Sequence, residues 1–161
     1  MFQINDCVIH FREGLSTILA INNINGKDYF LLRPNHINGE NIYVPLETAA
    51  NIIRYPMTDK EATNLLKLMK GTKKDFNPNT KQRRDAYKKK LSSGKIEDIA
   101  YLYKQLFLYS RLGGENNNEI KLGLVDIEML ESAKKMLIDE LSLTFEMDKT
   151  KVEEYINKKI K

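Results

Sequence analysis

The sequence predicts an α+β protein in which a small β module is followed by a bundle of helices. Residues 1–55 consist of short apolar and β-branched runs separated by turn residues, and from Pro56 onward apolar residues recur at the spacing of helices. Of the 161 residues, 42% are hydrophobic and 30% are charged, which is typical of a globular protein with a core. We therefore expect two domains, residues 1–55 and residues 56–161.

Five short strands are expected in the first domain. Asn25-Gly26 is a strong signal for a tight hairpin, and Asn5-Asp6 and Pro34-Asn35 mark further turns. The strands are expected within residues 2–11, 15–24, 28–33, 41–46 and 52–55, with a helical turn over residues 47–51. Five strands in so short a segment favour a strongly bent sheet or a small barrel.

The second domain begins with the spacing of a capping box. Thr58 and Glu61 are expected to open a helix that ends at Lys70. Further helices are expected at residues 80–91 and 96–112, a long one is capped by Asp126, and a charged terminal one begins at Asp148. Residues 71–78 and 113–123 should connect them. The helix at residues 96–112 is so apolar that we expect it at the centre of the bundle.

The most basic part of the chain lies between Lys70 and Lys95. It holds ten basic and two acidic residues, a local net charge of +8, whereas the whole chain carries only +4. Such a field suits a polyanion, because each phosphate contact releases counterions. A charge run of this kind is also typical of a solvated helix face, so the pattern by itself leaves both interpretations open.

No catalytic constellation is evident, and we expect no enzyme, no metal site and no cofactor. The two histidines, His10 and His36, have no cysteine or second histidine at metal-ligand spacing, so a structural role is expected for each. The single cysteine, Cys7, cannot form an intramolecular disulfide, which agrees with a reducing cytoplasm. No apolar run approaches the roughly 20 residues that span a bilayer. We expect a cytoplasmic protein without a membrane partner.

Four groups of residues form a pattern that extends along nearly the whole chain. The first group is Ile4, Asp6, Val8, His10 and Gly14, and the second is Tyr29, Leu32, Val44 and Pro45. The third is Gln82, Arg83, Leu91, Ser93 and Gly94, and the fourth is Ala133, Lys134, Met136, Leu137, Glu140 and Leu141. In their order and spacing, these residues resemble the CarD family of bacterial transcription regulators.

The resemblance implies a Tudor-like or SH3-like small β-barrel at residues 1–55 and an all-α helical DNA-binding domain at residues 56–161. In the family, the barrel is shared with the transcription-repair coupling factor and adds its sheet edge to the β subunit of RNA polymerase. The helical domain lies on promoter DNA at the upstream edge of the opened bubble and slows its closing. The chain would then act as a nucleoid-associated monomer.

The resemblance also assigns residues to the two partners. Polymerase contacts would fall on Ile24, Asn41, Ile42, Tyr43 and Val44. DNA contacts, which are largely independent of sequence, would fall on Thr80, Lys81, Arg83, Arg84, Lys88, Lys89 and Lys90.

The chain departs from the family pattern at three of these positions. Thr80 stands where members usually have a Trp that wedges into the minor groove, Arg84 stands where they have a Tyr, and Tyr43 replaces an Arg of some relatives. Because Thr80 is too small and polar to fill an unstacked base step, we expect DNA to be bound mainly by charge. Two alternatives stay open: an adaptor that binds polymerase and has lost DNA contact, and an RNA-binding barrel protein.

Overall fold

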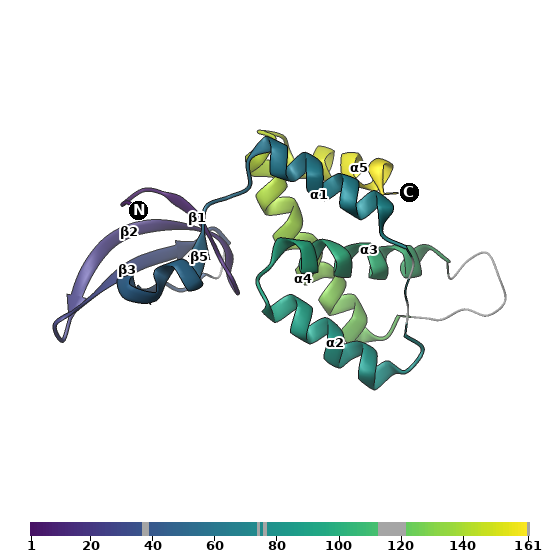
Figure 1. Ribbon diagram of the computed structural model, residues 1–161, viewed down its shortest axis with the longest axis horizontal. Helices are drawn as coiled ribbons and strands as arrows, with labels where there is room; N and C mark the ends of the chain where they lie inside the picture. The colour runs from purple at the N-terminus through teal and green to yellow at the C-terminus, as the bar shows by residue number, and fades with distance from the viewer. Residues whose placement is uncertain (37–38, 74, 76, 113–121, 161) are drawn as a thin grey trace. The chain divides into compact units, whose positions relative to one another are not determined.

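The computed structural model describes residues 1–36, 39–73, 75, 77–112 and 122–160. The chain forms two compact units, Met1–Met57 and Thr58–Lys161. Figure 1 shows the strands in the first unit and the long helices in the second. The predicted α+β fold, a small β module followed by helices, is confirmed.

The described part of the first unit is a five-stranded antiparallel sheet. Its strands are β1 (Cys7–His10), β2 (Gly14–Ile24), β3 (Lys27–Pro34), β4 (Ile42–Pro45) and β5 (Ile53–Arg54), and a 3-10 helix, η1 (Leu46–Asn51), precedes the last. The strand order is β4-β3-β2-β1-β5, so β4 and β5 are the edges. The short helix η1 contacts β3, β4 and β5 and thereby links the two ends of the sheet.

The hairpin between β2 and β3 forms where the sequence predicts it. Asn25 and Gly26 have positive φ values of 52° and 80°, the combination that a type I′ turn requires. A bulge between Ile18 and Ala20 bends β2. Alternate side chains of the curved sheet point into one core, which is formed by Val8, Ile18, Phe30, Leu32, Val44, Ala49 and Ile53.

The first strand lies within the predicted residues 2–11 and follows the turn predicted at Asn5-Asp6. Asn5 has a φ of 74°, and the Asp6 carboxylate accepts a hydrogen bond from the Gln3 N–H at 2.8 Å. An asparagine in the left-handed region cannot continue a regular strand, so β1 begins only at Cys7, although the Asn5 N–H and the Asp6 carbonyl oxygen still form backbone hydrogen bonds with Ile18 of β2.

His10 closes the other end of β1. Its Nδ1 accepts hydrogen bonds from the N–H groups of Arg12 and Glu13, at 3.3 and 3.1 Å. Burial lowers the pKa of His10, which favours the neutral ring that these two bonds require. The structural role expected for His10 is thereby confirmed.

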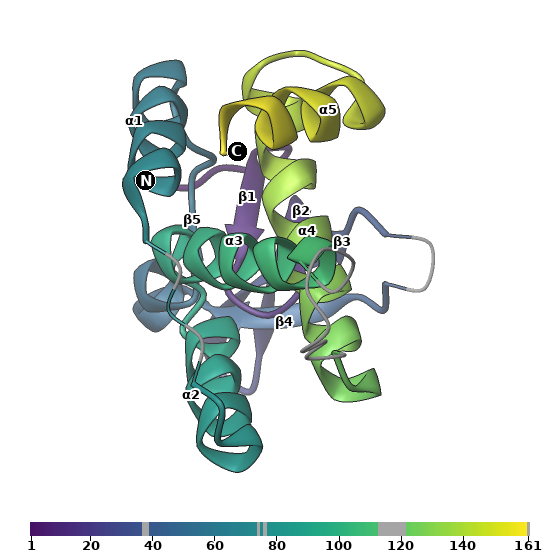
Figure 2. The same ribbon diagram turned by 90° about the vertical axis from the view of Figure 1, so that its right-hand side faces the viewer.

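The described part of the second unit contains five helices. They are α1 (Asp59–Gly71), α2 (Thr80–Ser92), α3 (Ile96–Leu112), α4 (Leu124–Thr144) and α5 (Lys149–Lys159). The predicted capping box is present: Thr58 Oγ1 accepts from the Glu61 N–H, and the Glu61 carboxylate accepts from the Thr58 N–H at 2.8 Å. Helix α3 contacts α1, α2 and α4, and Figure 2 shows it in the middle of the bundle, as its apolar sequence predicts.

The predicted start of α4 is wrong. The N-cap is Gly123 and the helix begins at Leu124, so Asp126 is its third residue and not its cap. The Asp126 carboxylate accepts a hydrogen bond from the Gly123 N–H at 3.3 Å and so still serves the helix end. Asp148, by contrast, is the N-cap of α5 as predicted. The connection predicted over residues 113–123 lies largely outside the described residues.

Candidate nucleic-acid and protein interfaces

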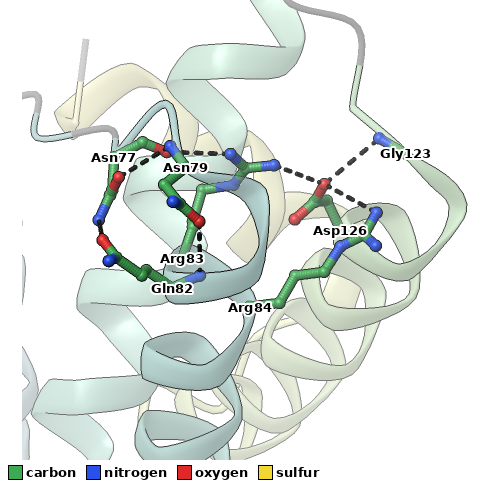
Figure 3. Close-up of polar contacts among 7 residues, drawn as sticks. All are labelled: Asn77, Asn79, Gln82, Arg83, Arg84, Gly123 and Asp126. Carbon is green, nitrogen blue, oxygen red and sulfur yellow. Dashed lines mark hydrogen bonds and ion pairs between the residues drawn. The ribbon is translucent and has the colours of Figure 1, made fainter.

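The basic helix α2 begins at a polar cap. Asn79 is the N-cap, and its Oδ1 accepts a hydrogen bond from the Gln82 N–H at 3.1 Å. Asn77 supports this cap: its Oδ1 accepts from the Asn79 N–H at 2.9 Å, and its Nδ2 donates to Gln82 Oε1 at 3.3 Å. Figure 3 shows this network at the start of the helix. The cap stabilises the first turn, which carries Lys81.

Arg83 points toward the inside of the helical unit. It is 4% exposed, its Nη2 donates to Asp126 Oδ2 at 3.1 Å, and its Nη1 donates to the Asn77 carbonyl oxygen at 2.9 Å. Asp126, on α4, is completely buried. Buried charges persist only when they are paired and hydrogen-bonded, so this ion pair determines which face of α2 is turned toward α4. A phosphate contact by Arg83 stays a prediction.

Arg84 reaches from α2 to the first turn of α4. Its Nη2 lies 3.7 Å from the same Asp126 oxygen, and its side chain is 32% exposed. The position that a Cβ on Gly123 would occupy is 2.6 Å from this Nη2, so the guanidinium lies where glycine leaves room. Two guanidinium groups therefore face one carboxylate (Figure 3). The two guanidinium groups together carry one more positive charge than Asp126 can neutralise, and the more exposed of the two groups is that of Arg84.

Lys81, Arg84 and Lys88 share one face of α2, and we call this row the cationic stripe. Their three- and four-residue spacings place them above one another along the helix. Lys81 and Lys88 are exposed and Arg84 is partly exposed. Because a helix rises 1.5 Å per residue, the stripe is roughly 10 Å long. A row of this length suits neighbouring phosphates of one nucleic-acid strand.

The other predicted DNA-binding residues are placed differently. Thr80 is exposed at the first position of α2, and Lys89 is exposed on a side of the helix away from the stripe. Lys90 is already engaged: its Nζ donates to Asp98 Oδ1 at 2.7 Å and lies 4.7 Å from the centre of the Tyr101 ring. The hydrogen bond from Lys90 lowers the pKa of Asp98, which keeps the carboxylate charged and the lysine compensated.

The predicted polymerase-binding residues lie on strand β4 or directly before it, with the exception of Ile24. β4 is an edge strand that pairs with β3 on one side. Val44 is 2% exposed and belongs to the core, whereas Tyr43 is 50% exposed and meets Tyr29 of β3 edge to face, with ring centres 6.4 Å apart. Asn41, just before the strand, is also exposed. Ile24 lies elsewhere, at the tip of the β2–β3 hairpin.

The described residues hold no group of three His, Cys, Asp or Glu side chains that could bind a metal. His36 instead lies beside Glu13, with 3.2 Å between its Nε2 and a carboxylate oxygen, and so ties the end of β3 to the turn after β1. None of the described helices combines the length and the apolar character that crossing a bilayer would require.

Sequence reasoning missed the pairing of α2 with α4. The pattern around Asp126 indicates a helix cap, but nothing nearby points to Arg83, which is 43 positions away. The spacing of Gly123 and Asp126 was a usable signal, because a carboxylate three residues after an N-cap is typical of a capping box. The role of Asn77 in supporting the cap left no recognisable signal.

Two family models match the chain. The model described as CarD-like/TRCF RID domain matches residues 2–56. The model described as CarD, C-terminal domain matches residues 64–157. A comparison with curated proteins gives no match. The two matched segments correspond to the sheet and to the helices, in that order.

Proposed function

The chain belongs to the CarD family of RNA polymerase-interacting transcription factors, and from this premise we propose that it binds the polymerase β subunit through β4 and promoter DNA through the cationic stripe. Bound in this way, it modulates the stability of the open promoter complex. It acts as a monomer and catalyses no reaction. It is located in the cytoplasm, where it associates with the nucleoid. The observation that carries the DNA part is the cationic stripe, which remains partly uncompensated beside the buried Asp126.

The form of the stripe favours phosphates over base edges. Lys81, Arg84 and Lys88 are long cationic side chains on one helix face, and phosphate contacts of this kind supply affinity without sequence information. The first unit, by contrast, has four basic and five acidic residues and therefore a net charge of −1. This difference supports DNA binding by the helical unit.

The edge strand β4 supports binding to a protein partner. An edge strand presents unpaired N–H and C=O groups to which another strand can be added. Val44 and Ile42 are anchored on the core of the sheet, while Tyr43 stands on the opposite face at the same edge. An incoming strand would therefore meet a firmly placed backbone and an aromatic side chain.

The DNA part is tested with Lys81→Gln/Lys88→Gln and a matched control, Lys151→Gln/Lys158→Gln. The control changes two exposed lysines with the same seven-residue separation on α5. The affinity for duplex DNA is measured at several salt concentrations. We expect the first variant to lower the dependence of log K on log salt by about 2, roughly one per phosphate contact, and the control to leave it unchanged. Equal slopes for all three proteins would contradict the proposal.

The polymerase part is tested with Tyr43→Lys and, as a control, Tyr155→Lys, which changes an exposed tyrosine on α5. We expect Tyr43→Lys alone to weaken binding to the isolated β subunit, because an added charge would be desolvated at the strand edge. In parallel, the lifetime of the open promoter complex should lengthen with the natural chain and less with either interface variant.

A second candidate function is that of an adaptor that binds polymerase but not DNA. It is favoured by the exposed Thr80 at the first position of α2, where the family has its wedge. This function would be indicated if the natural chain binds the β subunit yet leaves the lifetime of the open complex unchanged.

A further inference from the structure

Gln105, on α3, has no exposed surface, and both ends of its side-chain amide are bonded to one segment of the chain. Its Nε2 donates to the Lys73 carbonyl oxygen and its Oε1 accepts from the Asp75 N–H, each at 2.8 Å. Both partners belong to residues 72–79, which connect α1 to α2 and which we call the linker. The amide thus pairs with the linker backbone as a peptide group of a neighbouring strand would.

Filling space does not explain a glutamine at this place. An apolar side chain fills a core without needing partners, whereas a buried amide must be hydrogen-bonded. Most of the described linker residues are exposed, namely Lys73, Asp75, Asn77, Pro78 and Asn79. Because these residues bury no side chain of their own, hydrogen bonds determine the path of the linker.

Further hydrogen bonds continue from this point to the start of α2. The Tyr101 hydroxyl, one helical turn before the glutamine, donates to the Asp75 carboxylate at 3.3 Å. Arg83 Nη1 donates to the Asn77 carbonyl oxygen at 2.9 Å. Asn77 Oδ1 in turn accepts from the N–H of Asn79, the N-cap of α2. The linker is therefore attached to α3 at one end and to the first turn of α2 at the other.

This attachment bears on the cationic stripe, which begins with Lys81, the second residue of α2. Ion pairs hold α2 at Arg83 and Lys90. Both are contacts through long side chains, which can follow small movements of the helix. The linker, by contrast, attaches the backbone itself, at the point where the chain enters α2.

We propose that Gln105 is a positioning residue, which fixes the linker on α3 and so determines how α2 presents the cationic stripe. This inference rests on the proposed DNA binding. Gln105 acts from inside the helical unit, since it has no surface with which to touch DNA.

The test is Gln105→Met, which keeps nearly the same side-chain volume and removes both hydrogen bonds. The control, Gln3→Met, makes the same change at an exposed glutamine of the first unit. Amide hydrogen exchange reports on the linker through Asp75 and on the start of α2 through Gln82 and Arg83, whose N–H groups bond to the N-cap. We expect exchange at these amides to be about tenfold faster in Gln105→Met, as for the loss of one or two net hydrogen bonds. The control should exchange as the natural chain does.

DNA binding gives a second measurement that a mere space-filling role would not change. In Gln105→Met, a misplaced stripe should meet fewer phosphates at once. We expect the slope of log K against log salt to become shallower by up to about one, although the variant removes no charge. Gln3→Met should keep the natural slope.

Urea unfolding checks that Gln105→Met is folded. We expect little change in overall stability, because the backbone groups released at Lys73 and Asp75 lie in an exposed segment and can bond to water. Should the variant not fold, Tyr101→Phe provides the same test with a smaller effect, since it removes only the hydroxyl that bonds to Asp75.

Natural exchange rates in a folded Gln105→Met would overturn the inference, because a residue of the same size would then suffice. Faster exchange with natural DNA affinity and salt slope would overturn it too, since α2 would then present the stripe without a fixed linker. A natural chain that binds no DNA at low salt would overturn the proposed function instead. Exchange at Gln82 and Arg83 would still decide whether Gln105 places α2.

Discussion

Tyr87 places a polar atom inside the helical unit without a hydrogen bond among the described residues. Its side chain lies on the buried face of α2 and is 5% exposed, and its hydroxyl has no partner there. Burial raises the pKa of Tyr87 to about 12. A buried hydroxyl without a partner costs free energy relative to its hydrated state, so the ring of Tyr87 stabilises the packing of α2 and its hydroxyl does not.

We expect Tyr87→Phe to be at least as stable as the natural chain at pH 7 and increasingly more stable above pH 10. An unfolded tyrosine releases its proton near pH 10, whereas the folded one does so near pH 12. In this window the folded state binds more protons, so the free energy of unfolding of the natural chain falls as the pH rises, by at most about 1.4 kcal/mol per pH unit. The Phe side chain has no ionisable group, so the free energy of unfolding of Tyr87→Phe does not fall with pH for this reason.

The measurement is urea unfolding of both proteins at pH 7, 9 and 10.5, with Tyr155→Phe, at a more exposed position, as the control. Other groups titrate equally in both proteins and cancel in the difference. A difference between natural chain and Tyr87→Phe that stays constant with pH would show that the hydroxyl titrates as it does in water.

Lys104 shows the opposite arrangement, a buried charge with partners. It is 3% exposed, and its ammonium donates to the carbonyl oxygens of Met69 and Lys70 at the end of α1. Burial lowers its pKa, while the carbonyls at a helix C-terminus favour a cation. Lys104 thus attaches the end of α1 to the central helix α3.

At the scale of elements, ion pairs of Arg83 and Arg84 with Asp126 join α2 to α4. Most of α2 is polar, and Arg83 and Tyr87 are its buried residues among those described. A helix with so little apolar surface gains little from hydrophobic burial, so its orientation depends on specific polar contacts. Arg83 and Asp126 supply the contact, and the cationic stripe faces outward as a result.

We expect Asp126→Asn to lower the free energy of unfolding by up to about 3–5 kcal/mol, because it leaves the Arg83 charge buried without its counterion. Urea unfolding followed by circular dichroism measures the change. The control is Asp85→Asn, an exposed acid on α2, which should change stability by no more than about 0.5 kcal/mol.

Adding Arg83→Met to Asp126→Asn should recover part of the lost stability, since the uncompensated charge is then removed. If Asp126→Asn and Asp85→Asn behave alike, the ion pair does not determine how α2 packs.

At the scale of the whole molecule, two units with separate cores carry different charges. Residues 1–57 have a net charge of −1, and since the chain carries +4, residues 58–161 carry +5. The sheet core contains Leu32 and the helical core contains Leu137, both with no exposed surface. Separate cores allow each unit to unfold locally without the other.

We expect Leu32→Ala to speed amide hydrogen exchange in residues 1–57 alone, and Leu137→Ala to speed it in residues 58–161 alone. Each change removes a buried leucine and should cost its own unit about 2–5 kcal/mol. The two variants serve as controls for each other, because the substitution is the same. Faster exchange throughout the chain in either variant would mean that the units unfold together.

The sequence by itself determined the order and boundaries of most elements. The Asn25-Gly26 hairpin, the capping box at Thr58 and the N-cap at Asp148 depend on residues within four positions of one another, so they can be recognised without the fold. The apolar run of α3 likewise predicts its central place, because a helix that is apolar on most sides must be covered. The excess of basic residues in and around α2 can likewise be recognised from the sequence alone.

The tertiary structure alone decided which of those basic residues face outward. Arg83 and Lys90 look like Lys81 and Lys88 in the sequence, but each meets a carboxylate from another helix, Asp126 or Asp98. In a helix as polar as α2, no periodic apolar pattern indicates the buried side, so the side is set by partners that are distant in the chain.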